Sequence, residues 1–326
     1  MAVHLNGQRQ ALAPGTTDDV VAGGDHGGAT IPSRPVASHT IRRVRGQRSM
    51  TELFDDQLFD AHVLLSDPAR FAMKPMGAGF WDEKTGELAR PLGLVEYRKA
   101  TGGAVTGFAA LQVGVDPAYG LLEARWLASL PAPELEAIIA WAPVADGARV
   151  RTYLEALVGI DPRVAGVRHV LELEPKGFGT TDAFVAGVRL LAEFGLSFEL
   201  GVKFHQLGEA VMLAERCPAT RFILGHVGKP ALDDPAPWAS SLASLARLPN
   251  VVCKMSGLPT EADHADWRPE NLADCFARAA DLFGADRLVF GGDWPIVDLA
   301  GGWRRWRAAV EHLTRHWRAE DRRKLW

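Results

Sequence analysis

Several absences narrow the class of this protein. The sequence of 326 residues holds only three cysteines, at Cys217, Cys253 and Cys275, and none belongs to a Cys-x-x-Cys pair. We therefore expect neither a disulfide framework nor a cysteine-based zinc site, and we expect a reducing, cytoplasmic environment. No apolar run approaches the roughly 18 residues that a membrane span requires. The N-terminal stretch also lacks the apolar core of a secretion signal.

An excess of one charge is also missing. The chain has 36 Lys and Arg residues against 40 Asp and Glu residues, for a net charge of −4. This balance indicates neither a nucleic-acid footprint nor a polybasic membrane anchor, so the expected partner is a small molecule. The oligomeric state stays open, with a homo-oligomer as one option. Hydrophobic residues make up 47% of the chain, which is sufficient for one large core or two small ones.

Residues 1–50 differ from the rest of the chain. They are rich in Gly, Ala, Thr and Pro, show no sustained periodicity, and end in a basic run at positions 41–48. This composition is typical of a disordered extension. We therefore expect a disordered segment over residues 1–50 and one folded domain over residues 51–326.

The remainder alternates apolar strand-like runs with amphipathic helical patterns. Some helices carry start signals, such as Thr180-Thr181-Asp182. Strands that alternate with helices predict parallel βαβ units, and eight units in about 270 residues predict an α/β fold of the (β/α)8 TIM barrel type. A doubly wound open sheet is the alternative, but no Gly-x-Gly-x-x-Gly follows the first strand. The predicted strands are Leu58–Leu65, Val105–Val113, Ala137–Val144, Gly166–Leu171, Leu196–Val202, Thr220–His226, Asn250–Met255 and Arg287–Gly291.

Polar side chains concentrate where these strands end, which is where a barrel carries its chemistry. His62, His169, His205 and His226 fall at the ends of the first, fourth, fifth and sixth predicted strands, and Asp293 follows the eighth. Each histidine alone is more often structural, but the set is difficult to explain as packing. Imidazole and carboxylate groups bind divalent metals such as zinc, and they also act as general acids and bases near neutral pH.

The order of these motifs resembles the amidohydrolase superfamily, and in particular the amidohydrolase-related branch that includes sugar lactonases and 2-pyrone-4,6-dicarboxylate lactonase. The resemblance covers roughly residues 55–318 and implies a TIM barrel of a family of metal-dependent hydrolases. It rests on Phe59-Asp60-Ala61-His62, Leu122-Glu123-Ala124-Arg125-Trp126-Leu127, Gly225-His226-Val227-Gly228-Lys229-Pro230, Cys253-Lys254-Met255-Ser256-Gly257-Leu258 and Arg287-Leu288-Val289-Phe290-Gly291-Gly292-Asp293-Trp294-Pro295.

Three positions depart from the family pattern. Leu64 replaces the second histidine of the His-x-His motif, Gly225 replaces the Asp before His226, and Gly292 replaces the Ser before Asp293. Three ligands, His62, His226 and Asp293, could still hold zinc or manganese. Because side chains alternate along a strand, Leu64 is expected to point an apolar group at the metal position. The expected cofactor is therefore either none or one divalent metal.

The resemblance implies hydrolysis of a carboxylic ester bond, most simply in a lactone of a sugar acid or a pyrone. Asp293 would act as the general base on water, while His226 and His205 would polarise the carbonyl or protonate the leaving oxygen. Arg168, Lys229 and Lys254 could stabilise the oxyanion or bind a substrate carboxylate. Substrate contacts are further expected from His169, Ser256 and Trp81, the last within the long segment Met73–Arg90.

Other activities remain open at this stage. A decarboxylase or other lyase, or a lactone isomerase, could use the same barrel and similar groups. The three departures also leave room for a catalytically inactive paralogue that acts as a binding protein. A serine triad is not expected, because no Gly-x-Ser-x-Gly segment occurs.

Overall fold

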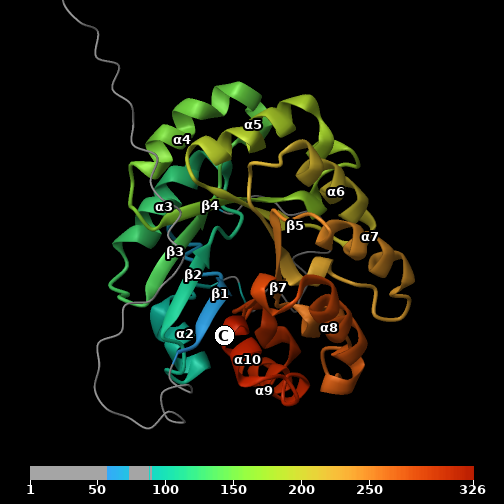
Figure 1. Ribbon diagram of the computed structural model, residues 1–326. Helices are drawn as coiled ribbons and strands as arrows, with labels where there is room; N and C mark the ends of the chain where they lie inside the picture. Colours follow the sequence, from blue (N-terminus) through green and yellow to red (C-terminus); the bar gives the residue numbers. More distant parts are fainter. Residues whose placement is uncertain (1–56, 73–87, 89) are drawn as a thin grey trace, which may run out of the picture. The chain divides into compact units, whose positions relative to one another are not determined.

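Eight parallel strands form the centre of the molecule (Figure 1). The computed structural model describes residues 57–72, 88 and 90–326. The strands pair in sequence order from β1 to β8, and Val63 forms a parallel bridge with Trp294, which follows β8. Leu64 N also donates to Trp294 O at 2.8 Å. The strands are β1 Phe59–Val63, β2 Gly107–Leu111, β3 Leu135–Ala140, β4 Val164–Val170, β5 Ser197–Gly201, β6 Phe222–Leu224, β7 Val251–Met255 and β8 Leu288–Phe290.

Helices lie outside this sheet and connect its strands. The predicted α/β class and (β/α)8 TIM barrel are confirmed, since each predicted strand overlaps an observed one and the eight strands pair in sequence order to form a nearly closed barrel. An additional C-terminal helix, α10, was not predicted. The expected extension, residues 1–50, lies outside the described residues. The helices are α2 Leu94–Thr101, α3 Gly120–Ser129, α4 Arg151–Val158, α5 Asp182–Glu193, α6 Leu207–Arg216, α7 Ala236–Ala246, α8 Pro269–Phe283, α9 Trp303–Leu313 and α10 Ala319–Leu325.

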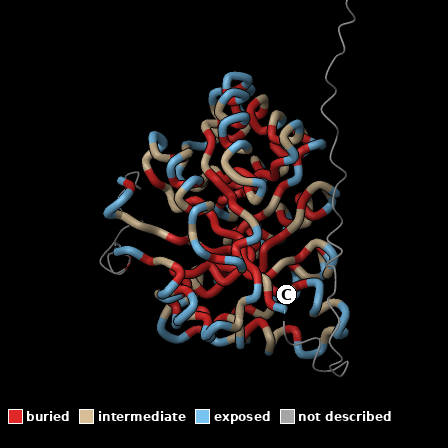
Figure 2. The backbone as a smooth tube through the Cα atoms, turned by 90° about the vertical axis from the view of Figure 1, so that its left-hand side faces the viewer, coloured by how far each residue is buried: buried red, intermediate tan, exposed pale blue. Residues whose placement is uncertain are grey.

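The strands are buried on both faces, as expected for a parallel barrel covered by helices. All five residues of β2 are buried, and Figure 2 shows buried residues through the interior with exposed residues on the outer turns. Inside the barrel, Ala109, Leu111 and Ile139 form a small apolar cluster, against which Leu64 packs. Most of the polar residues described below are buried among the same strands and the turns that follow them.

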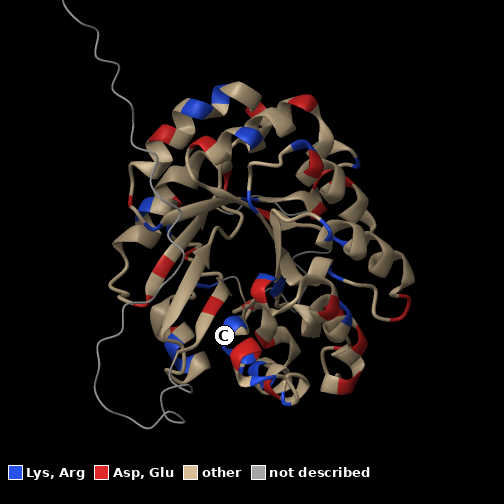
Figure 3. Ribbon diagram, viewed as in Figure 1, with Lys and Arg blue, Asp and Glu red and all other residues tan. Residues whose placement is uncertain are grey.

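The surface carries no marked separation of charge. Lys and Arg residues are interspersed with Asp and Glu residues over the outer helices (Figure 3). Among the described residues, no helix is long and apolar enough to cross a membrane.

Trp326 contacts the first residue of β1 and a residue of β8. Phe59 N donates to Trp326 O at 2.7 Å, and the Trp326 ring lies 4.6 Å from the ring of Phe290 on β8. Because Phe59 is the first residue of β1, this contact lies at the N-terminal end of the barrel, away from the polar residues at the opposite end.

Helix α5 packs so tightly that one glycine in it is obligatory. A Cβ at Gly187 would overlap the backbone carbonyl of Val144 in η2 (Val144–Val150). Helix propensity alone favours Ala over Gly by about 1 kcal/mol, but a backbone overlap costs about 1–3 kcal/mol or more. We therefore expect Gly187→Ala to lower the free energy of unfolding in urea titrations.

The matched control is Gly208→Ala in α6, where an added Cβ meets nothing within 4 Å. This substitution should leave stability unchanged or raise it by up to about 1 kcal/mol. Equal effects of the two substitutions would contradict the packing assigned to α5.

Candidate active site

The Asp60 carboxylate joins the first strand of the barrel to the turn that follows the last strand. Its Oδ1 accepts hydrogen bonds from His62 N at 3.0 Å and Gly292 N at 2.6 Å. Its Oδ2 accepts from Tyr97 OH at 3.0 Å and Trp303 Nε1 at 2.8 Å. Burial raises the pKa of Asp60, and these four hydrogen bonds lower it. Asp60 thereby fixes β1 and the turn after β8 to each other and to helices α2 and α9.

The turn after β8 leaves no room for a side chain at Gly292. A Cβ there would overlap the Trp303 indole and the Asp60 carboxylate. Asp293 follows in the left-handed region, with φ of 57°, a conformation that is uncommon outside glycine and is frequent at functional sites. The glycine found in place of the family's serine is therefore accounted for by the position of Asp60.

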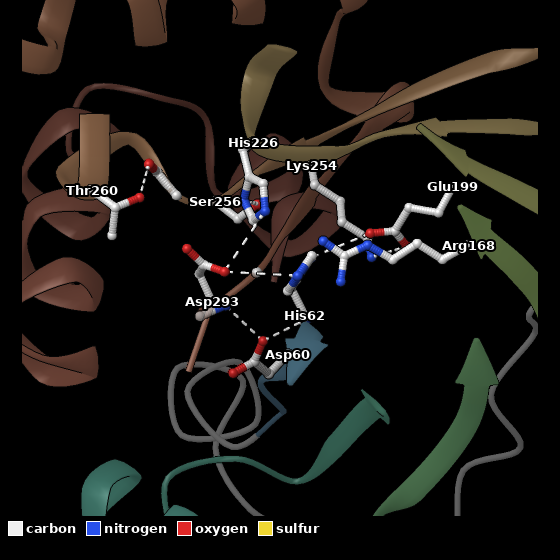
Figure 4. A network of polar contacts seen from close by, with 12 residues as sticks. Asp60, His62, Arg168, Glu199, His226, Lys254, Ser256, Thr260 and Asp293 are labelled. Atoms are coloured by element: carbon white, nitrogen blue, oxygen red, sulfur yellow. Dashed lines mark hydrogen bonds and ion pairs between the residues drawn. The ribbon is translucent and has the colours of Figure 1, made fainter. Parts of the chain in front are cut away.

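Three buried side chains converge at the carboxyl end of the barrel (Figure 4). His62 Nε2 and His226 Nε2 each lie 3.7 Å from Asp293 Oδ1. The two imidazole rings are 4.5 Å apart between centroids. One ligand atom from each of the three residues lies within 4.8 Å of the others. The structure thus brings together the predicted metal set and two of the three predicted catalytic residues.

A left-handed turn presents His226 to this cluster. Strand β6 ends at Leu224, and η6 (Gly225–Gly228) follows, with φ of 53° at His226 and 55° at Val227. Trp238 Nε1 holds the turn by donating to Val227 O at 2.7 Å. His226 Nδ1 lies 3.0 Å from Ser256 Oγ, which fixes the ring orientation. The predicted strand Thr220–His226 is therefore shortened by a turn that exposes one face of the imidazole to Asp293.

Burial sets the charge state of the three residues. It lowers the pKa of both His62 and His226 well below the usual value, and nearby cations lower both further. Burial raises the pKa of Asp293 to about 7, although Lys229 and Arg168 oppose the shift. At neutral pH the site therefore holds two uncharged imidazoles beside a carboxylate that is close to half-protonated.

Glu199 on β5 is a site residue that the sequence reasoning missed. Its Oε2 lies 2.6 Å from Lys254 Nζ on β7, and its Oε1 lies 3.3 Å from His62 Nδ1. All three side chains are at least 97% buried. One feature of the sequence could have identified it: Glu199 is a single acidic residue inside the apolar strand Phe198-Glu199-Leu200. A charge in such a strand needs a buried partner.

Arg168 on β4 has no carboxylate partner among the described residues. Its Nη1 makes a long contact of 3.4 Å with Gln112 O, and its buried Nε makes no hydrogen bond. Beside the larger effect of burial, its positive charge lowers the pKa of His62 and opposes the rise in the pKa of Asp293, so Arg168 acts on both residues. A buried cation without a counter-ion is a candidate for binding negative charge on a substrate or intermediate.

Lys229 and Lys254, the other predicted cations, are both paired. Lys254 binds Glu199 as described, and Lys229 Nζ lies 2.7 and 2.9 Å from the two carboxylate oxygens of Glu172. Lys229 is thus engaged in a salt bridge with Glu172, which follows β4.

The remaining predicted residues lie in different surroundings. His169 contacts Glu174 at 2.9 Å and lies between the rings of Phe178 and Phe184. His205 is exposed on η5 (Phe204–Gln206), and the structure does not bring it into the cluster. Trp81 lies outside the described residues, so its predicted role stays a prediction.

The three-residue cluster has the chemistry of a metal site. Both ring nitrogens of His62 are buried without a hydrogen-bond partner, and the depressed pKa values leave the imidazoles neutral, as metal ligands must be. Glu199 and Ser256 stand behind the two rings, in the place where outer partners usually orient metal-bound histidines. Leu64 removes a fourth ligand but packs on the apolar cluster, so the three remaining groups still fit one divalent cation.

A parallel barrel with a His, His and Asp cluster at the carboxyl ends of its strands has the architecture of amidohydrolases. The family model described as Amidohydrolase matches residues 81–325, and the chain belongs to this family. A solved amidohydrolase from Burkholderia multivorans with bound zinc is 25% identical, with a TM-score of 0.74, and the match covers 83% of this chain and 96% of that one. The same protein with bound HEPES gives 26% identity and a TM-score of 0.73.

Two curated relatives are lactonases. An L-fucono-1,5-lactonase from Burkholderia multivorans is 35% identical over 185 residues, which cover 50% of this chain and 60% of that protein. An L-rhamnono-gamma-lactonase from Scheffersomyces stipitis is 25% identical over 209 residues, covering 56% of this chain and 60% of that protein. The chain therefore spans less than two thirds of the length of the curated relatives described here.

We expect the buried Glu199–Lys254 ion pair to affect the stability of the fold. Glu199→Gln leaves the Lys254 ammonium buried without a counter-ion, so we expect a loss of about 3–5 kcal/mol in the free energy of unfolding. The double variant Glu199→Gln/Lys254→Met removes both charges and should recover most of this loss. Urea titrations of the single and double variants measure the coupling, and additive effects would show that the two groups do not interact.

Proposed function

We propose that this protein hydrolyses the ester bond of a lactone, with Asp293 as the general base. The observation that carries the proposal is the convergence of two neutral imidazoles on one buried carboxylate whose pKa is raised to about 7. A base with a pKa near the working pH is the most effective at proton transfer. The lactonase relatives, L-fucono-1,5-lactonase and L-rhamnono-gamma-lactonase, support the same reaction class.

The reaction follows from the position of Asp293. Its carboxylate removes one proton from a water molecule, and the water oxygen adds to the carbonyl carbon of the lactone. As the tetrahedral intermediate collapses, the bond from the acyl carbon to the ring oxygen breaks. The ring oxygen then takes up the proton held by Asp293, with His226 Nε2 near enough to relay it. The product is a hydroxy acid, and no atoms beyond those of water are required.

Arg168 is the group that we assign to the developing oxyanion. It is buried, bears a full positive charge, and has donors that no carboxylate among the described residues occupies. Preorganised donors of this kind contribute most where water is excluded, because the site does not reorganise as charge develops. We assign no step to His205, because its exposed ring lies outside the cluster.

We further propose that His62, His226 and Asp293 can hold one divalent metal. Two imidazole ligands favour zinc over manganese, which prefers oxygen ligands. A metal bound there would supply Lewis-acid polarisation of the carbonyl and a lowered pKa for bound water. The zinc in the solved amidohydrolase from Burkholderia multivorans supports this assignment.

We also propose that the protein works in a reducing, cytoplasmic environment. Cys217, Cys253 and Cys275 are all free and buried, so the described part of the chain contains no disulfide. Free buried thiols are typical of proteins that fold in reducing compartments.

Replacement of the base gives the first test of activity. Asp293→Asn keeps the size of the side chain but removes its ability to accept a proton, so kcat should fall by about 10²–10⁴-fold. Asp266→Asn, an exposed change of the same kind, serves as the control for turnover. Circular dichroism and thermal melting should show both variants folded. Full turnover by Asp293→Asn would rule out the assigned base.

The pH profile tests the same group in another way. In protein stripped of metal with a chelator, Asp293 is active only as the carboxylate, so kcat/KM should fall about tenfold per unit as the pH drops below about 7. Added zinc should move the inflection to lower pH, because a cation favours the deprotonated form of its ligands. A flat profile would contradict the general base, and an inflection insensitive to zinc would contradict the metal site.

A further inference from the structure

We propose that Glu172 selects substrates by charge. Through its ion pair with Lys229, it restricts the site to uncharged, hydroxylated lactones and rejects lactones that carry a carboxylate. This inference rests on the proposed lactone hydrolysis, and it identifies the substrate class that the same site accepts.

Glu172 and Lys229 form a largely buried ion pair. Glu172 lies on η3 (Leu171–Leu173), directly after β4, and Lys229 follows the turn that carries His226. Both carboxylate oxygens of Glu172 contact Lys229 Nζ, at 2.7 and 2.9 Å. The Glu172 side chain is only 4% exposed, and Glu261 adds a second carboxylate 4.0 Å from the same ammonium. The charge of Lys229 is thus fully balanced by protein groups.

Two other cations act on the cluster besides Lys229. Among the described residues, the positive charges that act on His62, His226 and Asp293 are those of Arg168, Lys229 and Lys254. Glu199 balances Lys254 at 2.6 Å. Only Arg168 keeps an uncompensated charge, and the oxyanion of the reaction requires it. Of these three cations, none is left to receive a carboxylate that the substrate itself carries.

A carboxylated substrate would therefore add an unbalanced negative charge next to Glu172, Glu261 and Asp293. Like charges brought together in a partly desolvated site are strongly disfavoured, and such repulsion is an effective means of rejecting the wrong ligand. The same arrangement aids turnover, because hydrolysis converts a neutral lactone into an anionic hydroxy acid. Paired lysines do not retain that product.

The test uses two lactones that differ only in the terminal group. D-galactono-γ-lactone ends in a neutral hydroxymethyl group, and D-galactaro-γ-lactone ends in a carboxylate. The wild-type protein should open the neutral lactone with the higher kcat/KM, by at least about tenfold. Glu172→Gln removes the balancing charge from Lys229, so the ratio of carboxylated to neutral kcat/KM should rise by about tenfold.

Glu155→Gln on the exposed face of α4 is the matched control, because it changes the net charge equally without touching Lys229. This variant should leave the ratio at its wild-type value. A wild-type preference for the carboxylated lactone, or a ratio that does not respond to Glu172→Gln, would overturn the proposal.

A binding measurement separates this inference from the proposed function. If neither the wild-type protein nor Glu172→Gln opens any lactone, the proposed hydrolysis fails. Calorimetric titration with galactarate then decides the role of Glu172. Binding of this dicarboxylate that is gained in Glu172→Gln but absent in wild type and Glu155→Gln supports charge selection. Equal binding by all three proteins contradicts it.

Discussion

The position of Asp293, the proposed general base, depends on another carboxylate, that of Asp60. Its four hydrogen bonds connect residues 232 and 243 positions apart in the chain, and they leave no lone pair for a substrate. Because Asp60 binds Gly292 N and excludes a side chain at that position, it fixes the backbone immediately before Asp293. Its bond to His62 N fixes the strand that carries the opposing imidazole. One buried anion thereby aligns both sides of the site.

Charge balance is the second constraint on the site. Of the described lysines, the two whose charges act on the cluster are each paired with a glutamate, Lys254 with Glu199 and Lys229 with Glu172. Burial keeps the imidazoles neutral and holds Asp293 near the middle of its titration. Arg168 remains as the unpaired charge among these residues. A site of this kind is suited to a reaction in which a neutral substrate develops negative charge at one defined point.

The sequence was sufficient for elements that local pattern determines. Strand–helix alternation predicted the barrel, and Thr180-Thr181-Asp182 predicted the start of α5, where Thr181 Oγ indeed accepts from Phe184 N. Contacts distant in sequence were not accessible. The partners of Asp60 and the pairing of Glu199 depend on tertiary packing. His205 was predicted to lie at the site because it stands at the end of the fifth predicted strand. In the structure it lies on η5, where its side chain is exposed.

We propose above that a water molecule deprotonated by Asp293 adds to the acyl carbon of a lactone. The most direct test of this addition is to let the protein open a lactone in ¹⁸O-labelled water. Mass spectrometry of the fragmented product then locates the label. We expect one ¹⁸O atom in the carboxylate of the hydroxy acid and none in the released hydroxyl. Label in the hydroxyl group would show cleavage of the alkyl–oxygen bond instead and would contradict the account.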